Sequence, residues 1–71
     1  MNKLSTRVRV ERARLDLSQE QFARKLNLTN ITISKIENGQ KVGPKSIKTL
    51  AKYFKVDTLI IRKEMLENEN N

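Results

Sequence analysis

Hydrophobic residues recur along most of the chain at the three- and four-residue spacing of one helix face, and strand-like alternation is nowhere sustained. The clearest pattern places Ile47, Leu50, Ala51 and Phe54 at i, i+3, i+4 and i+7. Pro44 precedes them and suits the first turn of a helix, because its missing N–H would have no partner there. This segment is therefore predicted to be an amphipathic helix.

An earlier helix is marked by its end signals. Ser18 and Gln21 form a capping-box pattern, in which each side chain satisfies a backbone N–H of the other residue. Asn27 tolerates the left-handed conformation that turns the chain at the other end. The predicted core face consists of Phe22, Ala23 and Leu26. These signals predict a helix from Ser18 to Leu26.

The next helix follows almost immediately. Thr29 is a good N-cap, and Asn38 with Gly39 supplies the stop, since glycine accepts a positive φ without steric strain. Ile33 and Ile36 lie on one side and are expected to face the core. These signals predict a helix from Thr29 to Asn38.

The two ends of the chain give one weak and one clear pattern. A first helix is predicted from about Leu4 to Leu15, with Val8 on the same apolar face and with Arg7, Arg9 and Arg14 able to reach solvent. Asp57 can cap a last helix through about Leu66. Residues 67–71 have nothing to bury and are predicted to form a flexible tail. We therefore expect one all-α domain of five helices over residues 1–66.

The second and third predicted helices, joined by a tight turn, have the spacing of a helix-turn-helix, whose second helix enters the major groove of DNA. At about 100° per residue, the direction of Ile33 and Ile36 fixes the opposite, outer face of the third helix. That face presents Ile31, Ser34, Lys35 and Asn38, with Asn30 and Thr32 on its flanks.

Four of these side chains are candidates for base contacts. Asn30 can form a bidentate pair with adenine, Ile31 or the Thr32 methyl can contact a thymine methyl, and Lys35 can reach guanine O6 and N7. Each residue has an alternative explanation. Asn30 and Thr32 also suit the chemistry of a helix start, Ile31 can be an ordinary exposed isoleucine, and Lys35 can be a solvated lysine.

Three residues are candidates for phosphate contacts. Gln19 lies at the start of a helix, where free N–H groups and the helix dipole attract an anion. Lys41 and Lys45 follow the outer-face helix and suit phosphates on the other side of the groove. The alternatives are an ordinary first-turn residue for Gln19 and solvated side chains for both lysines.

Composition supports a polyanionic partner. Fifteen Lys and Arg against eight Asp and Glu give a formal net charge of +7, which is typical of nucleic-acid binding, although a charge surplus alone can also serve solubility. Cysteine and histidine are absent, so we expect no disulfide, no metal site and no cofactor. No apolar run suggests a signal peptide or a membrane span, and a cytoplasmic protein is expected.

Enzymatic and RNA-binding functions find little support. No nucleophile and base can be paired, and no glycine-rich phosphate loop is present, so no catalytic residue is expected. Three aromatic residues, Phe22, Tyr53 and Phe54, two of them in core-like positions, provide no stacking platform for single-stranded bases.

The ordered set of motifs resembles the lambda-repressor and Cro-like helix-turn-helix family. The carriers are Arg12, Leu17-Ser18-Gln19-Glu20-Gln21-Phe22-Ala23, Leu26, Thr32-Ile33-Ser34-Lys35-Ile36-Glu37-Asn38-Gly39, Pro44, and Ile47 through Val56. The resemblance covers roughly Leu4 to Leu66. It implies a compact five-helix bundle that binds a pseudo-palindromic operator in double-stranded DNA as a homodimer, with Gln19 on a phosphate. It also implies an ion pair between Arg12 and Glu37, whose alternative is two separate solvated charges.

The last helix departs from the family pattern, which often has polar residues there. Leu59 and Ile60 accompany Ile61, Met65 and Leu66, which is more apolar surface than one stripe against a small bundle uses. We interpret Leu59, Ile60 and Leu66 as a dimer interface. The alternative is that all of this surface packs inside the monomer.

The leading hypothesis is a sequence-specific transcriptional regulator, a repressor that occupies an operator. The alternative is an antitoxin or another interaction module, whose apolar last helix engages a different protein partner. A homodimer in solution favours the first hypothesis, and a stoichiometric foreign partner favours the second.

Overall fold

The computed structural model describes residues 2–67. Within this range the chain forms the helices α1 (Lys3–Arg14), α2 (Gln19–Leu26), α3 (Asn30–Glu37), α4 (Pro44–Phe54) and α5 (Thr58–Leu66). The predicted all-α, five-helix bundle is confirmed. No helix of residues 2–67 combines the length and the apolar character that crossing a bilayer requires.

Most helix ends follow from local hydrogen bonds. Ser18 and Gln21 form both bonds of the capping box, and the Asp57 carboxylate accepts from the N–H of Leu59 at 2.9 Å. The start of α1 was predicted at Leu4 and lies one residue earlier. The reason is Asn2, whose Oδ1 accepts the N–H of Ser5 at 2.8 Å and so caps the helix.

The core is built from the predicted apolar faces. Its buried side chains are Leu4, Val8, Phe22, Ala23, Leu26, Ile33, Ile36, Ile47, Leu50, Ala51 and Ile61. Phe54 is only partly buried and packs on the edge of this cluster. Val10 of α1 is apolar but 61% exposed, and it does not belong to the core.

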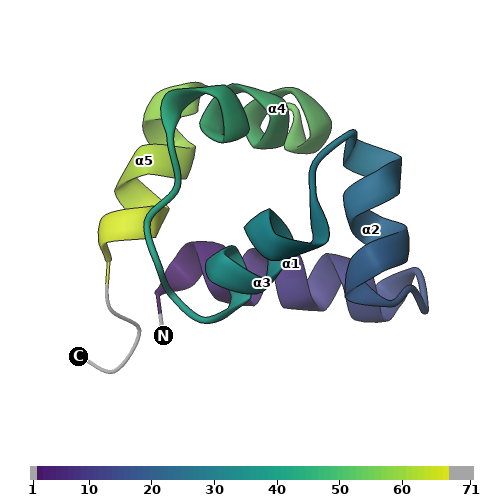
Figure 1. Cartoon of the computed structure of the whole chain (residues 1–71). Helices are drawn as coiled ribbons and strands as arrows, with labels where there is room; N and C mark the ends of the chain where they lie inside the picture. Colours follow the sequence, from purple (N-terminus) through teal and green to yellow (C-terminus); the bar gives the residue numbers. More distant parts are fainter. Residues whose placement is uncertain (1, 68–71) are drawn as a thin grey trace.

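The helices enclose the core on all sides. Figure 1 shows α4 opposite α1, with α2 and α5 along two different sides between them. α1 packs against α3 and α5, α2 packs against α3, and α4 packs against α5. Because α3 contacts both α1 and α2, its orientation is fixed by two neighbouring helices.

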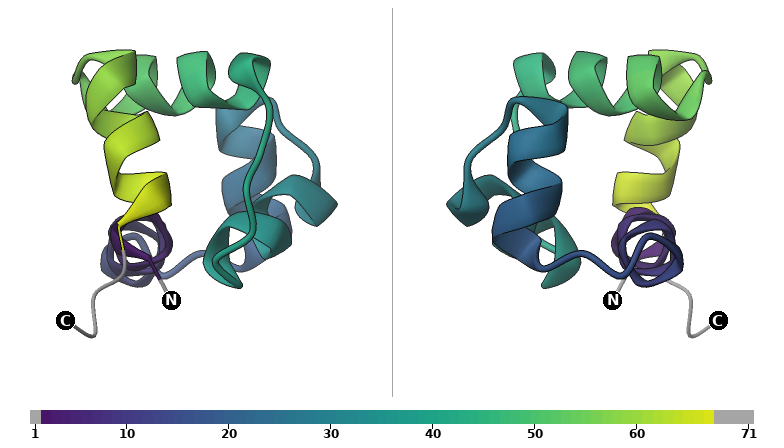
Figure 2. Two further views of the ribbon diagram at one scale, coloured as in Figure 1. Left: turned by 90° about the vertical axis from the view of Figure 1, so that its left-hand side faces the viewer. Right: turned by 90° about the vertical axis from the view of Figure 1, so that its right-hand side faces the viewer.

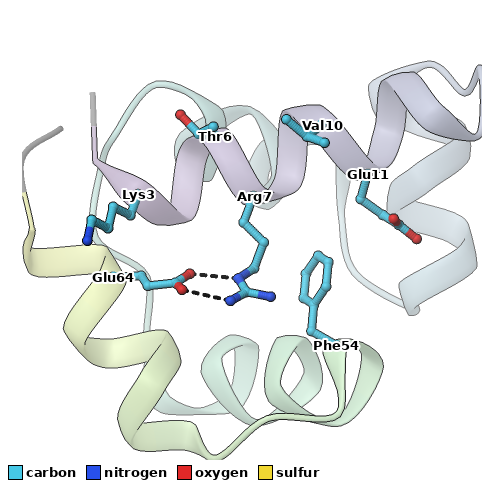
Figure 3. Close-up of a pocket in the computed structure, with 7 residues that line it drawn as sticks. All are labelled: Lys3, Thr6, Arg7, Val10, Glu11, Phe54 and Glu64. Carbon is cyan, nitrogen blue, oxygen red and sulfur yellow. Dashed lines mark hydrogen bonds and ion pairs between the residues drawn. The ribbon is translucent and has the colours of Figure 1, made fainter.

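Arg7 joins α1 to α5 (Figure 3). Its Nε and Nη2 donate to the two carboxylate oxygens of Glu64, both at 2.7 Å, and its guanidinium lies 5.1 Å from the ring centroid of Phe54. The hydrogen bonds to Glu64 keep the pKa of Arg7 above its usual value, although burial opposes them. Arg7 was expected to reach solvent, and its side chain is only partly exposed, because its guanidinium binds a residue 57 positions away along the chain.

The first and last described residues lie side by side. The Asn2 amide donates to the Met65 carbonyl at 2.8 Å, and the N–H of Lys3 donates to the Glu67 carbonyl at 3.2 Å. Glu67 is the C-cap residue of α5. The rest of the predicted flexible tail, residues 68–71, lies outside the described residues.

Candidate nucleic-acid interface

The turn between α2 and α3 depends on Asn27, which has φ 58° and ψ 39°. In this left-handed conformation the N–H of Leu28 bonds the Ala23 carbonyl at 2.8 Å, and the N–H of Asn27 bonds the Arg24 carbonyl at 3.1 Å. Asparagine adopts the conformation more readily than most residues that carry a side chain. The prediction that Asn27 turns the chain in the left-handed conformation is confirmed.

Thr29 begins α3 by accepting the N–H of Thr32 at 3.1 Å. Its hydroxyl also lies 2.9 Å from the hydroxyl of Thr32. Thr32 is partly buried, on the flank of the helix. Its hydroxyl is thus occupied by the helix start, which leaves its methyl group as the part suited to a base contact.

The two long faces of α3 differ sharply. Ile33 and Ile36 are fully buried, as predicted. On the outer face Asn30 and Lys35 are exposed, and Ile31 is 68% exposed. The structure thus brings Asn30, Ile31 and Lys35 together on one accessible side of a helix whose other side is fixed in the core.

The first turn of α3 also projects farther than its surroundings. Figure 2 shows it extending from the side of the molecule that is opposite to α1 and α5. The segment 38–43 and the start of α4 lie toward the same side. A helix start in this position has the shape required to enter a groove of duplex DNA.

A buried carboxylate fixes the far end of α3. Glu37 is 2% exposed, and its two oxygens accept from Arg12 Nε at 2.6 Å and Arg12 Nη2 at 2.9 Å. Arg12 Nη1 also donates to the Leu17 carbonyl at 3.0 Å, and Arg9 lies 3.8 Å from Glu37. The ion pair that the resemblance implied between Arg12 and Glu37 is therefore present, and it joins α1 to α3.

Gln19 belongs to the same cluster. Its Nε2 donates to Glu37 Oε1 at 3.2 Å. Sequence reasoning placed Gln19 on a phosphate and missed this bond, which links residues 18 positions apart. Burial by itself raises the pKa of Glu37, but the hydrogen bonds from Arg12 and Gln19 outweigh burial and hold this pKa below its usual value. Glu37 is therefore a carboxylate at neutral pH.

The starts of α2 and α4 offer N–H groups to an anion. The Ser18 cap satisfies Gln21, and the N–H groups of Gln19 and Glu20 have no hydrogen-bond partner within the part of the chain that the structure describes. No side chain caps α4. Lys41 and Lys45, before and at that helix start, are exposed. Both helix starts thus have the features of a phosphate-binding site.

A second cluster that sequence reasoning missed joins α1 to α4. Tyr53 Oη donates to Glu11 Oε2 at 2.5 Å, and Arg14 donates to both Glu11 oxygens. The bonds from Arg14 and Tyr53 lower the pKa of Glu11 from 4.5 to about 2. Burial and the bond to Glu11 raise the pKa of Tyr53 to about 12. The spacing of Glu11 and Arg14 marks a helical pair, whereas nothing local marks the partner Tyr53.

These pKa values predict how stability depends on pH. The pKa values of Glu11 and Glu37 are lower in the folded chain than their usual values, so the unfolded chain binds more protons in acid. Their contribution to stability is complete above the usual pKa of 4.5 and is lost as the pH falls toward 2. We expect the urea midpoint to fall over this range, and to fall less in the Glu11→Gln variant. Equal pH profiles for the two proteins, measured by circular dichroism, would contradict this account.

The apolar residues of α5 separate into two groups. Ile61 is fully buried and Met65 packs on the core. Leu59 is 69% exposed, Leu66 is 65% exposed and Ile60 is 42% exposed. The alternative that all of this surface packs inside the monomer is therefore wrong.

Comparison with known proteins gives one match. A family model described as "Helix-turn-helix" matches residues 8–61, which contain α2, α3 and α4 in full. No curated protein and no solved structure matches the chain. The match covers the turn at Asn27, the outer face of α3 and both helix starts that offer N–H groups.

Proposed function

The chain belongs to the helix-turn-helix family of DNA-binding regulators, and from this premise we propose that it is a repressor that binds a specific operator as a homodimer. In this proposal α3 lies in the major groove. The observation that carries it is the contrast between the faces of α3. Ile33 and Ile36 hold one face in the core, while Asn30, Ile31 and Lys35 occupy the other face without an intramolecular role in residues 2–67.

The side chains of this outer face suit base edges. Asn30 pairs with adenine, Lys35 with guanine O6 and N7, and Ile31 with a thymine methyl group. Thr32 contributes its methyl group, because its hydroxyl already bonds Thr29. A polar residue next to an apolar residue at a helix start distinguishes base pairs by two features, their hydrogen-bond pattern and the position of the thymine methyl group.

Phosphate contacts place α3 in the groove. One N–H of the Gln19 amide is used by Glu37, and its other N–H remains for a phosphate beside the start of α2. Lys41 and Lys45 hold the phosphates at the start of α4. These contacts carry no sequence information, but they set the depth and angle of α3.

Homodimer formation through α5 supports binding to two half-sites. Leu59 and Leu66 are seven residues apart, so they share one side of the helix, and both are exposed. Two leucines exposed on one side of a helix suit the apolar centre of an interface with a second copy. In this proposal the two copies bind two half-sites whose centres lie about 10 bp apart.

Selection of bound sequences from a random pool of duplexes tests this function. The expected result is a single enriched motif in two inverted copies, separated by about one helical turn. Enrichment of no motif would overturn sequence-specific binding. Enrichment of one isolated copy would overturn the homodimer on DNA.

Base and phosphate contacts predict different losses on the selected operator. Asn30→Ala or Lys35→Ala should cost about 1–3 kcal/mol at one base pair and relax the preference there. Lys41→Ala or Lys45→Ala should weaken operator and random duplex alike. Fluorescence anisotropy on single-base operator variants measures both effects. Equal losses on operator and random DNA from all four variants would refute the division between the two classes.

A foreign protein is the second candidate for the occupant of α5. The exposed Leu59 and Leu66 also suit an antitoxin or another interaction module. Light scattering of the purified chain distinguishes the two: a dimeric mass supports self-pairing. A monomeric mass, together with a stoichiometric partner after co-purification, supports the second candidate.

A further inference from the structure

The net positive charge of the chain comes from its middle segment. Residues 21–56 contain eight Lys and Arg and a single acidic residue, Glu37, which together account for the whole formal surplus of +7. Residues 1–20 and 57–71 carry seven basic and seven acidic residues and are neutral overall. One part of the chain therefore holds the entire net charge.

Ion pairs deepen this separation. Every Lys and Arg of α1 lies within 4 Å of a carboxylate oxygen, and Glu37 itself is shared by Arg9 and Arg12. The eight basic residues of the middle segment are all exposed, and none of them lies within 4 Å of a carboxylate oxygen in residues 2–67, although the charge of Lys25 contributes to the lowered pKa of Glu11. They are Arg24, Lys25, Lys35, Lys41, Lys45, Lys48, Lys52 and Lys55.

Four of these eight residues lie along α4 and at its C-cap. Lys45, Lys48 and Lys52 follow one another in steps of three and four residues, so at about 100° per residue they fall within about 60° of arc, and Lys55 follows as the C-cap residue. We call these four residues the α4 lysine stripe. At about 1.5 Å per residue it extends for about 15 Å, from the first turn of α4 to its C-cap.

Helix stability does not account for the stripe. Lys45 and Lys48 lie in the first half of α4, near the positive end of the helix dipole, where a cation is unfavourable. Lys55 is the C-cap at φ 58°, a conformation that glycine adopts without strain. No Asp or Glu occurs between residues 38 and 56 to form a helical ion pair with these lysines. The stripe therefore repels itself until a polyanion binds.

A second helix widens the stripe. A hollow of about 360 Å³ between α2 and α4 is lined by Lys25, Leu26, Thr49, Lys52 and Tyr53. Lys25 comes from the last turn of α2 and Lys52 from the stripe, so cations from two helices border one concave surface. An anionic group in this hollow would meet both charges at once.

We infer that the α4 lysine stripe, together with Lys25, is a second DNA-contacting surface that holds the phosphates of duplex flanking the operator half-site. The inference rests on the proposed function, because it requires an operator bound at α3. Continuity favours DNA over an acidic protein: the stripe begins at Lys45 in the first turn of α4, and the start of α4 lies toward the same side of the molecule as the start of α3 (Figure 2). Lysines act as point charges and hold phosphates regardless of sequence.

A straight duplex on α3 does not reach the whole stripe. α4 starts on the side of the molecule where α3 projects, and it ends near α5 (Figure 2). Each later lysine of the stripe therefore lies farther from the DNA that α3 would bind. Lys52 is about 10 Å and Lys55 about 15 Å beyond Lys45 along the axis, more than the Debye length of about 8 Å at physiological salt. Flanking DNA must therefore bend toward α4 to neutralise these charges.

Two duplexes and two double variants test the inference. The selected operator is placed in a short duplex of about 20 bp and in the centre of a long duplex of about 60 bp, and binding is measured by anisotropy at increasing salt. Lys48→Gln/Lys52→Gln removes two charges from the stripe. Lys3→Gln/Arg14→Gln removes two exposed charges from α1, which lies on the side opposite to the projecting first turn of α3 (Figure 2), as the matched control. Thermal melts by circular dichroism verify that both variants fold.

The slope of log K against log salt reports phosphate contacts at about 0.9 per contact. We expect the stripe variant to lose about 2 from this slope on the long duplex and little on the short one, while the control changes neither. Equal losses from both double variants, or equal losses from the stripe variant on both duplexes, would overturn the inference. The inference would also be overturned if the stripe variant bound DNA as the unaltered chain does but bound poly-glutamate more weakly. Failure of the unaltered chain to bind either duplex would overturn the proposed function as well.

Discussion

Replacement of Glu37 by glutamine is expected to lower the free energy of unfolding by about 2–3 kcal/mol. Glu37 is 2% exposed and accepts hydrogen bonds from Arg12 and Gln19. Glutamine keeps the shape but turns an N–H group toward these donors and leaves the Arg12 charge without its partner. Removal of one partner of a fully buried pair costs more, but Arg12 is partly exposed and water replaces some of the lost interaction.

Urea unfolding followed by circular dichroism measures this loss. Glu20→Gln is the matched control, because Glu20 is exposed and the charge change is the same. A domain of this size has a total stability of about 4–10 kcal/mol, so the Glu37 variant loses a large share of it while the control loses almost none. If the two variants unfold at the same urea concentration, the carboxylate does not hold α3 to α1.

The parts of the fold that the sequence predicted correctly depend on neighbours within three or four positions. The capping box of Ser18 and Gln21, the turn at Asn27 and the cap at Asp57 each join groups of a single chain segment. Such contacts form in almost any tertiary surrounding that permits the helix. Residue type and spacing were therefore sufficient to place them.

The contacts that sequence reasoning missed join residues far apart in the chain. Arg7 and Glu64 are 57 positions apart, and Glu11 and Tyr53 are 42 apart. Whether two such side chains meet depends on how their helices cross, and that is decided by core packing as a whole. Arg12 and Glu37 are 25 positions apart, so no local pattern links them, and only the family resemblance indicated that they pair.

The candidate site could be predicted from the sequence only in part. The outer face of α3 could be predicted because Ile33 and Ile36 fix the buried direction, and helix geometry then assigns every other residue. The occupation of Gln19 by Glu37 could not, because it requires the distance between the start of α2 and the end of α3. Gln19→Ala would consequently change both stability and DNA binding, which makes Lys41 and Lys45 the cleaner positions for testing phosphate contacts.

The exposed residues of α5 are not one continuous patch. Leu59 and Leu66 are about 20° apart around the helix, whereas Ile60 lies about 100° from Leu59. Arg62 and Lys63, both exposed, lie on either side of the line between Leu59 and Leu66. The apolar centre of a proposed homodimer is therefore formed by these two leucines, with Ile60 at its edge.

Leu59→Asp is expected to abolish the homodimer and to weaken binding to a two-half-site operator about 100-fold, because the second half-site then no longer binds at high effective concentration. Binding to a single half-site should be unchanged, since Leu59 is 69% exposed and the fold does not depend on it. Val10→Asp is the matched control: Val10 is 61% exposed and lies on α1, away from the proposed interface. Light scattering gives the mass, and anisotropy on one and two half-sites gives the affinities. Equal behaviour of the two variants would exclude α5 as the surface that joins the copies, because a loss shared with Val10→Asp reflects added negative charge repelled by DNA.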